Sequence, residues 1–230
     1  MNEINEMLKK EDDPQETNKN SWCGLIIFMV VLLLTVLGFR IVWTQNYGGV
    51  QVAGRSMQNT LQDGENLLVH YTKSGAVAER GDIIVVYVGD YQEFKTTTTE
   101  YLIKRLIAVE GDKVKCQDGV LSICYAGTDA YVELDESDYV YYTNADDYDF
   151  DEYVVGEGEI FFLGDNRNNS MDSRYNQKDG SHLKMLYKVE DIYGVVPDWA
   201  YENRETLAKI FFGENDFSRF INKIKQSLTK

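Results

Sequence analysis

The sequence predicts a mainly β fold, an antiparallel, barrel-like or sandwich-like β body behind one N-terminal transmembrane helix. Three observations support this prediction. One uncharged apolar run lies near the N-terminus, short segments rich in Val, Ile and Tyr follow it, and Gly, Asp and Asn separate these segments. Many short β-branched and aromatic runs bounded by turn residues are typical of a sandwich or barrel. The length of 230 residues suits one domain with appendages.

A polar tail and an apolar span come first. Residues 1–21 carry three lysines and six acidic side chains without apolar periodicity, which predicts a disordered tail. Residues 22–43 begin and end with Trp, and no charge occurs before Arg40. A helix of this length crosses a hydrocarbon core of about 30 Å, with Trp at both interfaces. A cleaved signal peptide is the weaker alternative, because the run is long and no small-x-small site follows it.

The charges beside the span predict its orientation. Lys9, Lys10 and Lys19 lie on its N-terminal side, and Arg40 and Arg55 lie beyond it. The positive-inside rule then places the N-terminus in the cytoplasm and the rest of the chain on the extracytoplasmic side. We therefore expect a single-pass protein of the cell membrane, with membrane lipid as a partner.

Segments with period-two patterning after the span predict the strands of the body, residues 44–203. We expect strands at residues 65–71, 81–88, 100–109, 112–116, 119–125, 159–165 and 189–196. The Asp118-Gly119 pair is a strong two-residue hairpin turn, and its register places Cys116 opposite Leu121. A disulfide to Cys124 would need another register, so two free cysteines are the alternative.

Two stretches differ from this pattern. Residues 126–159 are dense in Tyr, Asp and Glu, which predicts an exposed, variable insertion, although strands are possible there. Calcium binding is the weaker interpretation, because no loop has regular ligand spacing. Residues 204–230 place apolar side chains at helical spacing with lysines between them. We expect an amphipathic helix there, packed on the body or lying on the membrane surface.

The composition argues against several functional classes. The net charge is −15, and no basic patch offers the cations that nucleic-acid phosphates require. The chain has only His70 and His182 and lacks a Cys-x-x-Cys pair, so no metal site is expected. We expect no cofactor, no nucleic acid and no obligate protein partner.

Ser56, in the segment GRSMQNTL, is either a turn residue or a nucleophile. A serine nucleophile needs a base. His70 has no obvious acid to orient it, and His182 lies in a polar stretch rich in Gly and Ser, so a Ser-His-Asp triad is possible but has no local support. A lysine replaces histidine in Ser-Lys variants of the catalytic triad, provided that burial lowers its pKa. Lys104 shares one face of the expected strand at 100–109 with leucines. It either reaches solvent at an edge or is desolvated.

A polar loop follows the expected strand at 159–165. It places charged, amide and hydroxyl side chains within ten positions: Asp165, Asn166, Arg167, Ser170, Asp172, Ser173 and Arg174. The loop is either a surface segment with ion pairs or a hydrogen-bonding scaffold. In the second interpretation Ser170 orients a lysine amine, while Asp172 and Arg174 pair to hold the loop.

Four motifs occur in order behind the span, between about Val52 and Val196: GRSMQNTL, RGDIIVVY, IKRLIAVEGD and GDNRNNSMDSR. Together they resemble the type I signal peptidases, the membrane-bound Ser-Lys proteases of bacterial secretion, and most closely the Gram-positive type with a single span. The resemblance implies a serine endopeptidase that removes signal peptides from exported pre-proteins after a small-x-small motif, through an acyl-enzyme. Ser56 would be the nucleophile and Lys104 the general base.

The resemblance also implies the residues around this pair. Those supporting the chemistry or the oxyanion would be Gly54, Met57, Arg105, Ser170, Asp165, Arg167, Asp172 and Arg174. Those of the substrate cleft would be Val52, Ala53, Leu61 and Ile103.

Two positions depart from the family pattern. Asn59 stands where the family usually has proline, which loosens the turn without affecting the chemistry. Gly54 stands where some members have a serine that helps to bind the oxyanion, so backbone N–H groups, including that of Ser56, would bind it here. A non-catalytic binding factor and a protease with few clients remain the alternatives.

Overall fold

The computed structural model describes residues 14–90, 100–141, 149–174 and 187–212. The chain divides into two units, residues 1–45 and 46–230, and each is described by itself. His182 and most of the predicted C-terminal helix lie outside the described residues.

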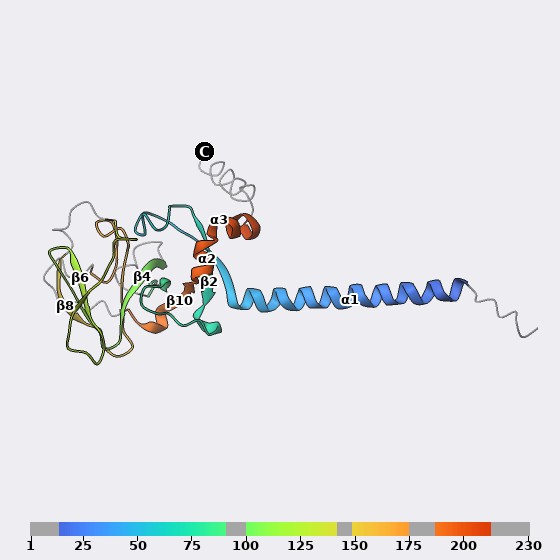
Figure 1. Ribbon diagram of the computed structural model, residues 1–230, viewed down its shortest axis with the longest axis horizontal. Helices are drawn as coiled ribbons and strands as arrows, with labels where there is room; N and C mark the ends of the chain where they lie inside the picture. Colours follow the sequence, from blue (N-terminus) through green and yellow to red (C-terminus); the bar gives the residue numbers. More distant parts are fainter. Residues whose placement is uncertain (1–13, 91–99, 142–148, 175–186, 213–230) are drawn as a thin grey trace, which may run out of the picture. The chain divides into compact units, whose positions relative to one another are not determined.

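The first unit contains α1, which runs from Pro14 to Asn46 (Figure 1). Its segment Trp22–Asn46 is long and apolar enough to cross a membrane, and none of its most apolar window is buried. The disordered tail predicted for residues 1–21 is wrong from Pro14 onward. Proline is favoured at the first helical position, and the long apolar helix that follows extends this start without a break.

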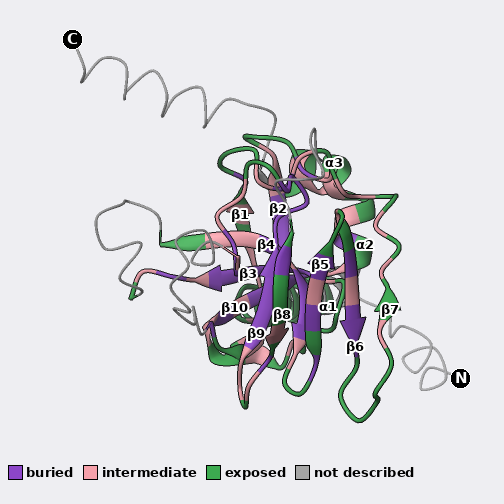
Figure 2. Ribbon diagram, turned by 90° about the vertical axis from the view of Figure 1, so that its left-hand side faces the viewer, coloured by how far each residue is buried: buried purple, intermediate pink, exposed green. Residues whose placement is uncertain are grey.

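The second unit is built on two antiparallel sheets. The first has six strands in the order β1-β2-β10-β3-β4-β9. Their bounds are β1 Tyr47–Gln51, β2 Asn66–Tyr71, β3 Ile83–Tyr87, β4 Tyr101–Val109, β9 Ile160–Leu163 and β10 Ile192–Val196. Burial is deepest in β3 and β9 (Figure 2), whose runs of Val, Ile, Leu and Phe have no outward polar face. The predicted mainly β, antiparallel body is confirmed.

The second sheet has the strand order β7-β6-β5-β8. Its bounds are β5 Lys113–Gln117, β6 Val120–Cys124, β7 Val132–Glu133 and β8 Phe150–Val154. Cys116 lies opposite Leu121 as predicted, because Asp118 and Gly119 both have positive φ and close a tight hairpin. The three cysteines are free.

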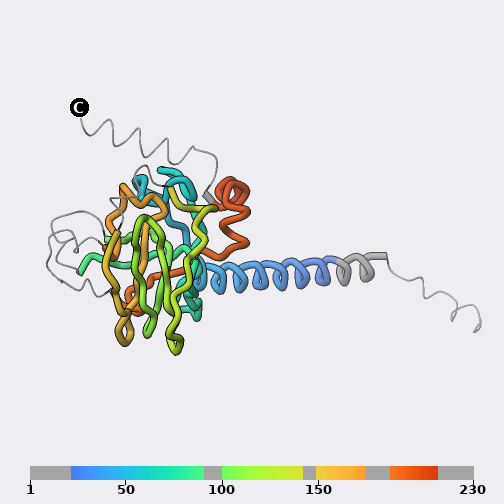
Figure 3. Tube along the Cα trace, turned by 60° about the vertical axis from the view of Figure 1, so that its left-hand side comes forward, coloured from blue at the N-terminus to red at the C-terminus, as the bar shows by residue number. Residues whose placement is uncertain are grey.

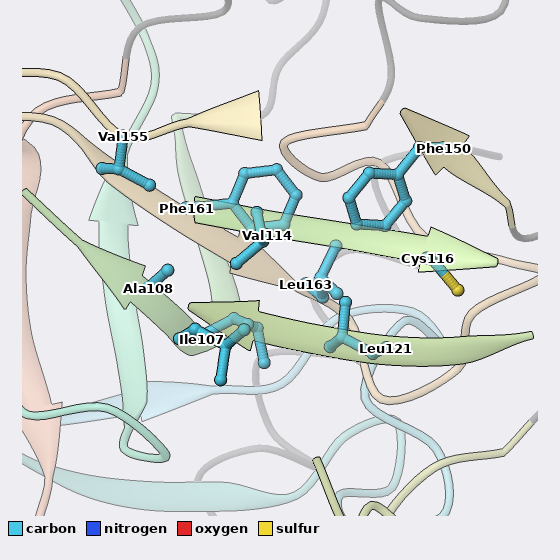
Figure 4. Close-up of a cluster of buried hydrophobic side chains, with 10 residues drawn as sticks. Ile107, Ala108, Val114, Cys116, Leu121, Phe150, Val155, Phe161 and Leu163 are labelled. Carbon is cyan, nitrogen blue, oxygen red and sulfur yellow. The ribbon is translucent and has the colours of Figure 1, made fainter. Parts of the chain in front are cut away.

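The stretch at 126–159 is only partly the exposed insertion that its charge predicts. Its described part supplies β7 and β8 to the second sheet. Phe150 and Val155 are buried in a core between the two sheets, where the Phe150 ring lies 5.5 Å from that of Phe161 in β9 (Figure 4). Acidic residues outnumber these apolar side chains in the sequence, but burial of the apolar side chains determines the local fold.

Short helices complete the described chain. They are η1 Thr72–Ser74, η4 Val189–Asp191, α2 Asp198–Glu202, α3 Arg204–Leu207 and the π-helical η5 Ala208–Phe212. Figure 3 follows the chain from β4 through the β5–β6 hairpin and back to β9. The second sheet is thus inserted in the sequence between β4, which carries Lys104, and its neighbour β9. Its apolar side chains pack against those of β4 and β9.

Asp112 fixes the point where the chain passes from one sheet to the other. Its carboxylate is fully buried. It accepts two hydrogen bonds from Arg80, at 2.7 and 2.9 Å, and one from each of the Val109 and Ala126 N–H groups. One side chain therefore joins the end of β4, the loop before β3 and the loop after β6.

Replacing Asp112 by Ala should lower the free energy of unfolding by about 2–3 kcal/mol, because backbone N–H donors lose their acceptor. Denaturant unfolding of the full chain in detergent measures this loss. The Arg80→Ala variant, which removes only the partly exposed ion-pair partner, should cost less. Equal losses in the two variants would contradict this role of the buried carboxylate.

Candidate active site

Ser56 lies in a turn that follows β1. The Val52 backbone pairs with Glu65 and Gly64, and the Gly54 N–H donates to Asp63 Oδ1. Gly54 has a φ of +90°, a conformation that favours glycine. The turn is therefore closed by its own backbone and by one carboxylate.

The turn is also attached to the loop after β9. The Asn166 N–H donates to Ser56 O at 2.9 Å, and Asn166 Nδ2 donates to Arg55 O at 3.1 Å. The Ser56 and Met57 N–H groups donate to no described residue. Two backbone donors beside the serine hydroxyl are thus available to a ligand.

Lys104 reaches this turn from the middle of the first sheet. Its side chain is 2 % exposed, and its Nζ lies 2.6 Å from Ser56 Oγ and 3.0 Å from Ile103 O. Burial lowers the pKa of Lys104 to about 8, and the negative charges of Asp172 and Asp165 limit that decrease. A neutral amine at this distance is able to take the proton of the serine hydroxyl.

His70 does not provide this base. The His70 ring stacks on Tyr47, with centroids 4.7 Å apart, and it does not line the cleft that contains Ser56. His182 lies outside the described residues. Of the candidate bases that the structure describes, Lys104 is the one that contacts Ser56.

Arg105, the neighbour of Lys104 on β4, holds Asp165. Two of its nitrogens bind the fully buried carboxylate at 2.9 and 2.7 Å. Thr60 Oγ1 donates to the same carboxylate at 2.5 Å. The Asp165 carboxylate therefore links the loop after β9 to the turn that carries Ser56, and both of its oxygens accept hydrogen bonds.

Asp172 and Arg174 form the pair expected from the sequence, with contacts of 2.9 and 2.8 Å. Burial alone would raise the pKa of Asp172, but the charge and hydrogen bonds of Arg174 and the Gly164 N–H hold it below its ordinary value. Ser170 Oγ is buried and makes no well-oriented hydrogen bond to a described residue, although it lies close enough to lower this pKa.

Arg167 is held by a residue that the sequence did not indicate. Its guanidinium donates to Gly164 O at 2.9 Å and to both Glu136 carboxylate oxygens. From the same stretch, the Tyr139 ring lies 4.1 Å from the Arg105 guanidinium carbon. Glu136 and Tyr139 lie in the acidic stretch, where no local pattern distinguishes them from their neighbours, because only the tertiary fold brings them to the arginines.

An open cleft of about 600 Å³ runs beside Ser56 and Lys104. Of the predicted cleft residues, Val52, Ala53 and Ile103 line it. Leu61 does not: it is 1 % exposed and packs in the core with Met57, Leu67 and Val69. The turn directs this side chain inward, so its assignment to the cleft was wrong.

The sequence did not indicate several other residues that line this cleft: Val50, Tyr101, Met171 and Tyr193. The described part of the chain contains no group of three or more His, Cys, Asp or Glu side chains placed to hold a metal ion. The site thus combines one hydroxyl, one buried amine, paired charges and free backbone donors.

The chain is similar to a protein family and to individual known proteins. Residues 22–199 match the family model described as signal peptidase, peptidase S26. Signal peptidase I of Bacillus licheniformis is 33 % identical over 168 residues, which cover 70 % of this chain and 83 % of the relative. Signal peptidase I T of Bacillus subtilis strain 168 is 32 % identical over 155 residues, covering 66 % and 74 %. A solved signal peptidase I from Enterococcus faecalis V583 is 24 % identical with a TM-score of 0.36, covering 53 % of this chain and 98 % of its own.

Gly164 separates the two serines of the site. A Cβ at this position would lie 2.5 Å from Ser56 O and closer still to Ser170 Oγ. The Gly164→Ala variant should therefore lower the free energy of unfolding by about 1–3 kcal/mol through overpacking.

Denaturant unfolding with Gly156→Ala as the matched control checks this expectation. A Cβ at Gly156 would meet only the end of the Glu159 side chain. That carboxylate is able to move at the expense of its hydrogen bonds from Tyr153 and the Gly156 N–H, whereas backbone atoms are not, so the loss should be smaller. A Gly164→Ala protein as stable as the Gly156→Ala protein would show that the site is looser than described.

Proposed function

Because the chain belongs to the signal peptidase family, peptidase S26, we propose that it is a membrane-bound serine endopeptidase that removes N-terminal signal peptides from exported pre-proteins. In this proposal Ser56 is the nucleophile and neutral Lys104 is the general base. The observation that carries it is the 2.6 Å contact between Ser56 Oγ and the buried Lys104 amine.

The reaction proceeds by proton transfer between these two groups. Lys104 takes the Ser56 proton as Oγ attacks the carbonyl carbon of the scissile bond, and the protonated amine then gives that proton to the leaving nitrogen. The acyl-enzyme remains on Ser56. Lys104, neutral again, takes a proton from water as the water oxygen attacks the ester carbon. The protonated amine then returns this proton to Ser56 Oγ as the ester bond breaks, which releases the signal peptide with a free carboxyl group and restores both residues.

Backbone donors bind the oxyanion in this proposal. The free N–H groups of Ser56 and Met57 support it, since preorganised donors at such a position stabilise the developing negative charge. Gly54 offers no side-chain hydroxyl. Its positive φ shapes the turn that presents these donors.

The charged residues of the loop after β9 act as positioning residues in this proposal. Asp165, Arg167, Asp172 and Arg174 are each in a close ion pair, which supports a rigid frame rather than a direct part in the chemistry. The buried Ser170 hydroxyl is available to orient the Lys104 amine. A buried hydroxyl without another well-oriented bond supports that role.

The substrate binds as an extended strand against β4. The Val88 N–H donates to Glu100 O and the Leu106 N–H donates to Asp82 O. Even-numbered residues of β4 therefore direct their backbone groups toward β3, and Tyr101 and Ile103 direct theirs to the opposite side. Strand β9 pairs only from Arg105 onward, so no described strand pairs with this side of β4 before Arg105, and a peptide is able to pair there. Val52, Ala53 and Ile103 surround the small side chains at positions −1 and −3.

The membrane arrangement is part of the same proposal. Residues 1–21 lie in the cytoplasm, residues 22–43 cross the cell membrane, and the peptidase body at 44–203 lies on the extracytoplasmic side. Beyond this body, the described residues Arg204–Phe212 are helical. The apolar, uncovered side chains of α1 support the anchor.

The test is cleavage of a pre-protein with an Ala-x-Ala site by the full-length protein in detergent, from pH 6 to 10. Only neutral Lys104 accepts the proton, so kcat/KM should rise with pH and level off above the lysine pKa of about 8. The Ser56→Ala and Lys104→Ala variants should each lose at least about 10³-fold in kcat/KM.

The control is Lys113→Ala, which removes an exposed lysine of β5 and should leave the rate and its pH dependence unchanged. An active Lys104→Ala variant would refute the assignment of the base. A wild-type protein that cuts no pre-protein would refute the proposed activity itself.

A further inference from the structure

The cleft has a row of tyrosines at the end away from Ser56. Tyr71, Tyr193, Tyr101 and Tyr87 follow one another across β2, β10, β4 and β3, with successive ring centroids 5.1, 5.1 and 5.3 Å apart in edge-to-face contact. Tyr101 and Tyr193 line the cleft. Edge-to-face packing holds each ring in a defined orientation, so the row is a rigid wall.

Three local features place these rings on one face of the first sheet. A β-bulge between Ile192 and Gly194 sets the side chain of Tyr193. Tyr87 and Tyr101 lie directly opposite each other on β3 and β4. The hydroxyl end of Tyr71 lies over Gly48, where any side chain would collide with it. Glycine in β1 therefore leaves room for the ring that supports Tyr193.

The distance from the reacting atoms follows from strand geometry. Tyr101 precedes Lys104 by three residues on the extended β4, which corresponds to about 10 Å. Ile103 lies between them, beside the open backbone edge. Moving two residues along β4, from Ile103 to Tyr101, matches a move of two residues along a paired peptide, since alternate side chains share a face.

A peptide acylated on Ser56 therefore places successive odd positions along this wall. The side chain at −1 lies next to Ser56, the one at −3 lies next to Ile103 and Val52, and the one at −5 reaches Tyr101 and Tyr193. The even positions point away from the sheet.

The chemistry of this end of the cleft is apolar with aromatic edges. Tyr101 is 44 % exposed, so its ring has surface for a ligand to cover. Among the described residues that line the cleft, the charged ones are Arg55 and Lys104, both at the Ser56 end. A large apolar or aromatic side chain gains by covering the rings, whereas a charged one would lose hydration against them.

We propose that Tyr101 and Tyr193 form a subsite for a large apolar or aromatic side chain at the fifth residue before the cleaved bond. This proposal rests on the proposed function. It adds a second criterion of substrate choice beyond the small residues at −1 and −3.

The experiment compares two pre-proteins that differ only at −5, with Leu or Ala, and keep Ala at −1 and −3. With the full-length wild type in detergent, kcat/KM should be about tenfold higher for Leu, the scale that an apolar contact of this size supplies. The ratio should fall close to one in Tyr101→Ala. It should persist in Tyr101→Phe, which keeps the ring, and in Tyr125→Ala, which removes an exposed tyrosine in the loop after β6.

A charge-reversal variant keeps the test decisive if Tyr101→Ala folds poorly. Tyr101→Asp should prefer Lys over Leu at −5, because a carboxylate then stands where the ring was. Equal rates for Leu and Ala in the wild type, a ratio that Tyr101→Ala leaves unchanged, or a preference at −4 instead would overturn the subsite. Failure of the proposed function has a different result, since the wild type would then cleave neither pre-protein.

Discussion

The site depends on keeping the Lys104 amine buried against Ser56 without giving it a carboxylate partner. The two nearest acids, Asp165 and Asp172, are each bound through both oxygens by an arginine. Their charges still raise the pKa of Lys104, but burial outweighs them and the pKa falls to about 8. A direct ion pair would instead hold the amine protonated and remove the base.

The frame around this pair comes from segments far apart in the sequence. The serine turn, β4, the loop after β9 and the acidic stretch meet there, and the second sheet braces them through the shared aromatic core. The Glu136 carboxylate accepts hydrogen bonds from Arg167, and Arg167 also donates to the Gly164 carbonyl. Because Gly164 has no side chain, Ser56 O and Ser170 both lie close to its backbone. A frame of this kind fixes the reacting groups on rigid elements, which catalysis by positioning requires.

Local patterns predicted the strands and the hairpin register at Asp118, since alternation and turn chemistry act over a few residues. The pairing of Lys104 with Ser56 was implied by the resemblance to a known family, because alternation shows only that Lys104 lies on an apolar strand face. Contacts made by the tertiary fold were not predictable in this way. Leu61 turned inward to the core, and Glu136 and the tyrosine row have no local signal. The helix from Pro14 was missed because the polar tail has no apolar periodicity of its own, and the helix there continues from the apolar span that follows.

The most direct test of the central claim is the titration of Lys104 itself. NMR of the full-length protein with labelled lysine side chains, compared with the same spectrum of Lys104→Ala, assigns one signal to this residue. The account predicts that this signal titrates near pH 8, below the ordinary lysine value. A Lys104 signal that stays protonated above pH 10 would contradict it, because the amine would then be charged when the protein acts.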